Sequence, residues 1–214
     1  MNSNRKSSQF LIVLGFAFFM LIIHTNCNVN RFEKTNTYAI DNDRFDDNND
    51  KLYVENNYPY SKNSNIITHN YFTLSYNEEH EQAEWVAYRL KSTSFSGVNR
   101  TNDYREDPSV ASGSASPYDY INSGYDRGHL ASAESMSKNY TAMSESFYMS
   151  NMSPQDPGFN RGIWKRIESK VRYWTELSDS LHIVTGPLLK NPIKKVGNNR
   201  VSVPNAFYKT ILVY

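Results

Sequence analysis

Residues 126–129, with the sequence DRGH, combine side chains suited to acid–base chemistry on an anionic substrate. Histidine accepts a proton near neutral pH because its unperturbed pKa is about 6.5. A guanidinium group is always charged, and its planar N–H groups match phosphate oxygens. We expect the other histidines, which lack comparable neighbours, to be structural or solvated: His24, His69, His80 and His182.

Three further segments accompany this stretch. They are residues 100–108 (RTNDYREDP) upstream, and residues 150–155 (SNMSPQ) and 159–164 (FNRGIW) downstream, with Glu168 following the last. In these motifs, their order and their spacing, the chain resembles the DNA/RNA non-specific endonuclease family, the relatives of endonuclease G within the ββα-metal superfamily. The resemblance covers about residues 68–214.

The resemblance implies a sugar-non-specific endonuclease that acts on DNA and RNA and leaves 5′-phosphate ends. It also implies one Mg²⁺-like ion, for which Mn²⁺ could substitute. His129 falls on the general base, Asn160 on the metal-binding residue and Glu168 on the acid that helps to hold the metal's water shell. The resemblance also places Arg100, Asp126 and Arg127 in catalysis or phosphate binding, and Arg161, on the basic face of the predicted helix, is a further candidate for substrate binding.

The residue types fit this chemistry on physical grounds as well. An amide oxygen and waters suit Mg²⁺, which keeps much of its hydration shell. If Asn160 and Glu168 lie on one helix, their spacing separates them by about 12 Å along its axis. We therefore predict that Asn160 binds the ion directly and that Glu168 acts through metal-bound water.

The distribution of charge is also informative. The whole chain has 23 basic and 22 acidic side chains, so no overall basic field indicates a polyanionic partner. Residues 160–214, however, contain 10 Lys or Arg against three acids. No base-reading module is recognisable, so we expect binding to DNA and RNA to be backbone-led and indifferent to sequence. The sequence indicates no protein partner and no oligomeric state.

The length of 214 residues and 39% hydrophobic content favour one domain with a packed core, and a single Cys excludes an intrachain disulfide. The pattern predicts an α+β fold with a mixed or antiparallel sheet, packed helices and a ββα-metal core. We expect strands at 71–76, 147–150, 181–185 and 207–214, helices at 78–90 and 161–177, and a long functional loop at 91–123.

The N-terminal region differs in composition. An apolar run at 10–23 follows Arg5 and Lys6, which is typical of a signal peptide, so residues 1–27 are interpreted as an export signal or anchor. Export also suits an unspecific nuclease, which would attack the genome in its own cytoplasm. Cys27 leaves open a lipoprotein anchor. The Asn- and Asp-rich residues 28–66 are interpreted as a linker, and residues 67–214 as the endonuclease domain.

The chain stops within a predicted strand, where members of this family continue, so we expect the domain to be incomplete at its C-terminus. This leaves a second hypothesis open. In it, the chain is a truncated, inactive remnant that only binds nucleic acid or a partner.

Overall fold

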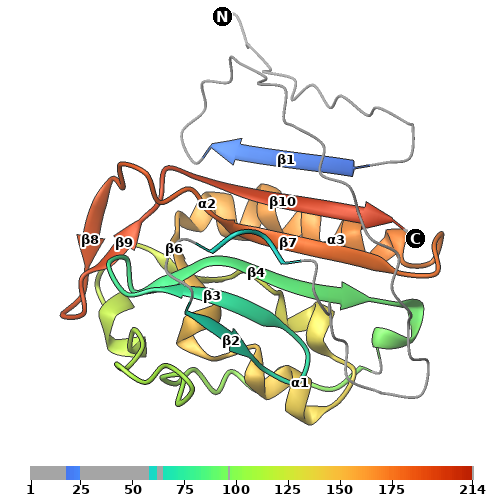
Figure 1. Cartoon of the computed structure of the whole chain (residues 1–214), viewed down its shortest axis with the longest axis horizontal. Coiled ribbons are helices and arrows are strands. Elements are labelled where there is room, and N and C mark those ends of the chain that lie inside the picture. Colours follow the sequence, from blue (N-terminus) through green and yellow to red (C-terminus); the bar gives the residue numbers. More distant parts are fainter. Residues whose placement is uncertain (1–17, 25–57, 62–64, 96, 214) are drawn as a thin grey trace, which may run out of the picture.

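A six-stranded antiparallel sheet forms the body of the molecule (Figure 1). The computed structural model describes residues 18–24, 58–61, 65–95 and 97–213. The strand order in the sheet is β1-β10-β7-β4-β3-β2. The strands are β1 (Phe18–His24), β2 (Ile66–Thr68), β3 (Thr73–Asn77), β4 (Gln82–Leu90), β7 (Leu181–Pro187) and β10 (Ala206–Val213).

The described part of the chain also contains two short antiparallel ribbons, three α-helices and several short 3₁₀ helices. The ribbons pair β5 (Asp126–His129) with β6 (Met152–Gln155), and β8 (Lys194–Val196) with β9 (Val201–Val203). The helices are α1 (Tyr140–Glu145), α2 (Pro157–Phe159) and α3 (Lys165–Trp174), and a π-helical turn, Asn160–Trp164, joins the last two. The predicted α+β class is confirmed.

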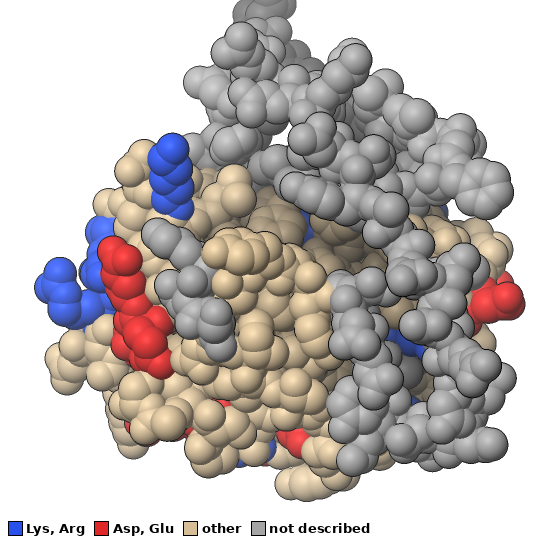
Figure 2. All heavy atoms as spheres, viewed as in Figure 1, with Lys and Arg blue, Asp and Glu red and all other residues tan. Residues whose placement is uncertain are grey.

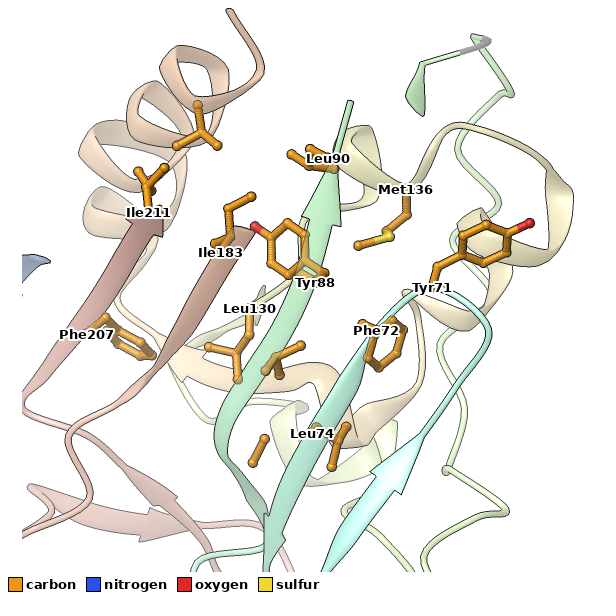
Figure 3. Close-up of a cluster of buried hydrophobic side chains, with 14 of the residues drawn as sticks. Tyr71, Phe72, Leu74, Tyr88, Leu90, Leu130, Met136, Ile183, Phe207 and Ile211 are labelled. Atoms are coloured by element: carbon orange, nitrogen blue, oxygen red, sulfur yellow. The ribbon is translucent and has the colours of Figure 1, made fainter. Parts of the chain in front are cut away.

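The main core lies between the sheet and the helical layer. In Figure 1, α2 and α3 lie behind β7 and β10. One buried cluster joins Trp164, Ile167 and Val171 of the helical segment to Ile183 of β7 and Phe207 of β10. Figure 3 shows side chains of β3, β4, β7 and β10 converging with Leu130 and Met136. This packing fixes the helix against the sheet, and Leu130, the residue that follows β5, lies in the same core.

The prediction of a helix at 78–90 was wrong, because β4 occupies residues 82–90. Glu81, at φ 53°, lies in the turn between β3 and β4, and Thr73 pairs with Ala87. The apolar spacing suggested a helix because a central strand covered on both faces gives a nearly continuous hydrophobic run rather than an alternating one. Trp85 and Tyr88, both buried, belong to that run.

The predicted strand at 147–150 was also wrong. After α1 the chain forms successive three-residue turns, in which the N–H groups of Phe147, Tyr148 and Asn151 donate to carbonyls three residues earlier. The strand begins only at Met152. Phe147 and Met149 are buried in the core although they belong to no sheet, so their apolar character indicated burial rather than a strand.

The other expected elements are present. The strand predicted at 71–76 corresponds to β3, and those at 181–185 and 207–214 correspond to β7 and β10. The helix predicted at 161–177 corresponds to the π-helical turn and α3. In their described part, residues 91–123 contain loops, two short 3₁₀ helices and an isolated bridge between Arg105 and Tyr148.

Part of the predicted leader lies in the sheet, as β1 pairs antiparallel with β10. Residues 10–17, Cys27 and most of the predicted linker lie outside the described residues. No helix in the described ranges has the length and apolar character needed to cross a bilayer.

Candidate active site

A β-hairpin followed by a helical segment forms the centre of the site. β5 and β6 pair with Asp126 opposite Gln155 and His129 opposite Met152. Only glycine fits at 128, because a Cβ there would lie 2.2 Å from Cδ of the fully buried Gln155 side chain. The helical segment begins at α2, two residues after β6. This hairpin and helix give the predicted ββα arrangement.

The imidazole of His129 lies among aromatic rings, with 8% of the residue exposed. The Phe147 ring meets it edge-on at 4.9 Å and the Tyr104 ring at 6.0 Å between centroids. The indole N–H of Trp164 donates to the His129 carbonyl at 3.2 Å, which ties the end of β5 to the helical segment.

The protonation state of His129 follows from this environment. Burial, and then the nearby charge of Arg100, lower the pKa of His129 to about 3. Nε2 of the ring is buried and has no hydrogen-bond partner among the described residues. The imidazole is therefore neutral at pH 7, and a neutral imidazole has one nitrogen that accepts a proton.

Asn160 lies beside a carboxylate that orients its amide. Its Nδ2 donates to Oδ2 of Asp126 at 2.9 Å, and Arg161 donates to both oxygens of the same carboxylate, at 2.6 and 2.8 Å. Burial alone would raise the pKa of Asp126, but these hydrogen bonds and the arginine charges lower it. Since the amide NH₂ of Asn160 faces Asp126, its oxygen is directed away from that carboxylate.

Asn160 is held in place by a π-helical turn and by the N-cap of α2. The Asp156 side chain accepts from the N–H groups of Gly158 and Phe159, and its carbonyl accepts from the Asn160 N–H at 2.8 Å. The π turn begins at Asn160 itself. Such turns occur frequently at functional sites.

Glu168 lies on α3, two turns after Asn160. Its Oε1 is buried and has no hydrogen-bond partner among the described residues. Burial raises the pKa of Glu168 to about 7, although the charge of Lys209 opposes this rise. Such a carboxylate is suited to a cation or its water shell, because an unpaired buried oxygen is otherwise costly.

Tyr104 contacts both predicted phosphate-binding arginines. Its hydroxyl accepts from Arg100 at 3.3 Å, and the Arg127 guanidinium lies 4.3 Å from the centroid of its ring. Arg100 also forms an ion pair with Glu134 at 3.3 Å. Tyr104 lies within the motif at 100–108, but the sequence indicated no role for it, and nothing in the sequence singled out Glu134.

One open cavity of about 490 Å³ brings all seven predicted residues together. They are Arg100, Asp126, Arg127, His129, Asn160, Arg161 and Glu168. Seven others complete its lining: Tyr104, Tyr120, Ile121, Tyr125, Ser132, Glu134 and Lys165. His129 and Asn160 therefore line the same cavity, as a shared reaction centre requires.

The cavity does not offer a site with three or more protein ligands for a metal. Within the described ranges, no group of three or more His, Cys, Asp or Glu side chains could hold an ion. It does offer the amide oxygen of Asn160 and the unpaired carboxylate oxygen of Glu168. That donor set fits a hard cation which keeps most of its waters, as Mg²⁺ does.

The charged side chains are unevenly distributed over the surface. Figure 2 shows the face opposite the helical layer, where charged residues are few and Lys and Arg gather mainly at the edge formed by β8 and β9. The cavity, in contrast, is lined by Arg100, Arg127, Arg161 and Lys165. The cavity therefore presents four basic side chains beside three acidic ones, Asp126, Glu134 and Glu168.

The hairpin and helix thus bring a neutral histidine, an oriented asparagine and several arginines to one cavity, a set of groups suited to acid–base chemistry on a phosphate ester. The family model for DNA/RNA non-specific endonucleases matches residues 49–214. The chain belongs to this family.

Curated relatives agree with the assignment. The chain is 40% identical over 152 residues to the mitochondrial nuclease EXOG of Danio rerio, covering 65% of this chain and 44% of that protein. It is 35% identical over 155 residues to mitochondrial endonuclease G of Homo sapiens, covering 66% and 52%. A nuclease of Nostoc is 34% identical over 152 residues, covering 69% and 54%. The chain thus spans about half the length of these relatives.

A solved structure extends the similarity to the fold. A crystal structure of the EndoG/EndoGI complex, which concerns EndoG inhibition, matches with a TM-score of 0.63 and 34% identity. The match covers 68% of this chain and 66% of that one.

Proposed function

We propose that this chain carries the catalytic site of a metal-dependent, sugar-non-specific endonuclease that hydrolyses phosphodiester bonds in DNA and RNA. The observation that carries the proposal is the single cavity in which a neutral His129 faces the same space as Asn160, Glu168 and the arginines. A general base must be deprotonated before it can accept a proton, and His129 meets that condition at pH 7.

Each residue has a role that follows from its chemistry. His129 takes a proton from the attacking water. Arg100 and Arg127 bind the non-bridging phosphate oxygens with fixed positive charge. Tyr104 restricts both guanidinium groups, which lowers the entropy lost when they bind phosphate. Arg161 neutralises Asp126 and extends the basic surface toward the substrate backbone.

Asn160 would hold a divalent cation through its amide oxygen, and Glu168 would bind the waters of that cation. The ion, when bound, supplies positive charge at the phosphate and the leaving oxygen. Asp126 keeps the amide of Asn160 in the orientation that this requires. Mg²⁺ is the proposed ion, with Mn²⁺ as a substitute, because the donors are hard oxygens.

The test is cleavage by the purified full chain of plasmid DNA and of RNA, with Mg²⁺ and with excess EDTA. We expect both substrates to be cut with Mg²⁺ and neither with EDTA. The His129→Ala variant should lose at least about 100-fold in rate, because a general base contributes about 10²–10⁴-fold. His182→Ala is the matched control, since His182 is a histidine of β7 outside the cavity lining.

The products provide a second readout. If the ends carry 5′-phosphate, polynucleotide kinase will label them only after phosphatase treatment. A His129→Ala variant that cuts at the parent rate would contradict the mechanism. A folded parent that binds DNA without cutting it would favour the inactive-remnant hypothesis instead.

We also propose that the chain is exported, on the basis of the apolar run at 10–23 behind two basic residues. Cell fractionation followed by N-terminal sequencing of the recovered chain tests this. Recovery of the unprocessed chain from the cytoplasm alone would contradict it.

A further inference from the structure

The segment that immediately precedes β5 forms one wall of the cavity. It consists of the 3₁₀ helix Pro117–Tyr120 and the loop 121–125, and three of its residues line the cavity: Tyr120, Ile121 and Tyr125. Ile121 is 59% exposed. A single exposed isoleucine is ordinary on a protein surface, but this one lies at a cavity that is otherwise lined largely by charged groups. The 117–125 wall therefore offers the cavity an apolar surface.

The turn between β8 and β9 holds the 117–125 wall in place. The buried Asp119 carboxylate accepts from the backbone N–H of Ser116 at 2.7 Å, and from the backbone and side-chain N–H groups of Asn199, both at 2.9 Å. The Ile121 N–H donates to the Tyr118 carbonyl at 3.2 Å. Because these bonds fix the backbone before a ligand arrives, little conformational entropy is lost when the wall binds one.

The wall also contains a buried polar group that lacks a partner. Tyr120 is 5% exposed, and its hydroxyl has no hydrogen-bond partner among the described residues. Its ring belongs to a buried cluster that includes Met152 of β6 and Val203 of β9. Leaving a buried hydroxyl unpaired is costly. A sugar or phosphate oxygen of a bound nucleotide can accept the hydrogen bond that this hydroxyl is able to donate.

Positive charge adjoins the wall at two places. Arg127 of β5, two residues after Tyr125, lines the same cavity. The Lys194 ammonium of β8 lies 4.9 Å from the centroid of the Tyr125 ring. In a polynucleotide, each nucleoside lies between two phosphates. A strand with phosphates near both cations therefore passes along the wall and brings a sugar and a base to it.

We propose that the 117–125 wall is a subsite for one unpaired nucleobase beside the scissile phosphate, and that Ile121 contacts the face of that base. Such a contact tolerates every sequence, because every base has an apolar face. The face is free only where the base is unstacked, as in single strands, loops and ends. The subsite thus favours single-stranded or locally opened nucleic acid. The inference rests on the proposed function, because it names the form of nucleic acid that the same cavity binds.

The test uses two single strands of equal length that carry the same phosphates: an oligodeoxyadenylate and a strand of abasic tetrahydrofuran units. The measured quantity is the ratio of kcat/KM for the two strands with Mg²⁺. We expect the parent to prefer the oligodeoxyadenylate by about 10-fold, and Ile121→Ala to reduce this preference about fivefold.

Two further variants control for packing and for the loss of an apolar side chain elsewhere. Ile121→Leu keeps the apolar surface, so its preference should lie within about twofold of the parent value. Leu177→Ala truncates a leucine that is 69% exposed and lies outside the cavity lining, so it should keep the preference of the parent. An Ile121→Leu variant with as little preference as Ile121→Ala would contradict an apolar contact.

The failures of the subsite and of the proposed function are distinguishable. A parent that cleaves both strands equally well, or an Ile121→Ala variant with the preference of the parent, would overturn the base subsite while cleavage itself supports the proposed function. A parent that cleaves neither strand would overturn the proposed function, and the subsite with it.

A duplex provides a second readout. In a dA·dT duplex the bases stay stacked, so Ile121→Ala should slow cleavage less than about twofold. Equal slowing on the duplex and on the single strand would show that Ile121 does not act through an unpaired base, and would overturn the inference.

Discussion

Replacing His129 by Asn should make the folded protein less sensitive to acid. In the folded chain, burial and the charge of Arg100 lower the pKa of His129 to about 3, whereas in the unfolded chain it is about 6.5. Between these values the unfolded chain takes up a proton that the folded chain does not bind. Stability is therefore lost as the pH falls below about 6.5, and the loss continues down to about pH 3.

The size of the effect follows from the two pKa values. Protonation of His129 in the unfolded chain lowers the free energy of unfolding by a few tenths of a kcal/mol at pH 7 and by about 2 kcal/mol at pH 5. Moving from pH 7 to pH 5 should thus destabilise the parent by about 2 kcal/mol more than it destabilises His129→Asn. His182 also has a lowered pKa, of about 4, but it is present in both proteins and cancels in the difference.

Urea unfolding of both proteins at pH 7 and pH 5 measures this quantity. The free energies of unfolding at the two pH values give the loss for each protein, and subtracting the two losses gives the contribution of His129. If the parent and the variant lose the same free energy, His129 is not held neutral by burial. The lowered pKa of His129 in the folded chain would then be wrong.

Other substitutions test how the hairpin and helix build the site. Asp126→Asn replaces one of the two oxygens that accept from Asn160 and Arg161 with a donor NH₂ group. We therefore expect Mn²⁺ affinity, measured by the loss of the free-ion signal in electron paramagnetic resonance, to fall about 10-fold with the fold retained, and unchanged affinity would show that the amide of Asn160 needs no orienting partner. Gly128→Ala forces a methyl group onto the buried Gln155 side chain and should cost about 1–3 kcal/mol in urea unfolding. The matched control is Gly162→Ala, where a Cβ meets nothing within 4 Å and where alanine in a helical segment should stabilise by about 0.5–1 kcal/mol. Equal effects of the two alanine substitutions would contradict the close approach at Gly128.

The local sequence pattern correctly predicted the helix and strands whose hydrophobic spacing is typical of their structure. The amphipathic spacing in 161–177 predicted the helical segment, and the aromatic and β-branched runs predicted β3, β7 and β10. The site residues were predicted because four short motifs resemble those of the DNA/RNA non-specific endonuclease family, and their residue types also fit the chemistry. The sequence therefore determined which residues are available for the reaction and which helix carries Asn160 and Glu168.

The local sequence pattern predicted the wrong element where apolar residues reflect burial in the tertiary structure rather than the periodicity of a helix or strand. Val86 and Leu90 fit a helix as well as a strand, and only the coverage of both faces of β4 decides between them. Phe147 is buried in a series of turns against His129, and its apolar character indicates burial rather than a strand.

Only the tertiary structure determined the pKa values and the orientations of the side chains in the site. It pairs Asp126 with Arg161, surrounds His129 with aromatic rings, and brings the buried ammonium of Lys209 to the Leu130 carbonyl, 79 positions earlier in the chain. A pKa depends on desolvation and on charges a few ångströms away, and those neighbours come from distant segments. The sequence determined the kinds of groups in the site, and folding determined their charge states and orientations, because both depend on contacts made only when the sheet and helix pack together.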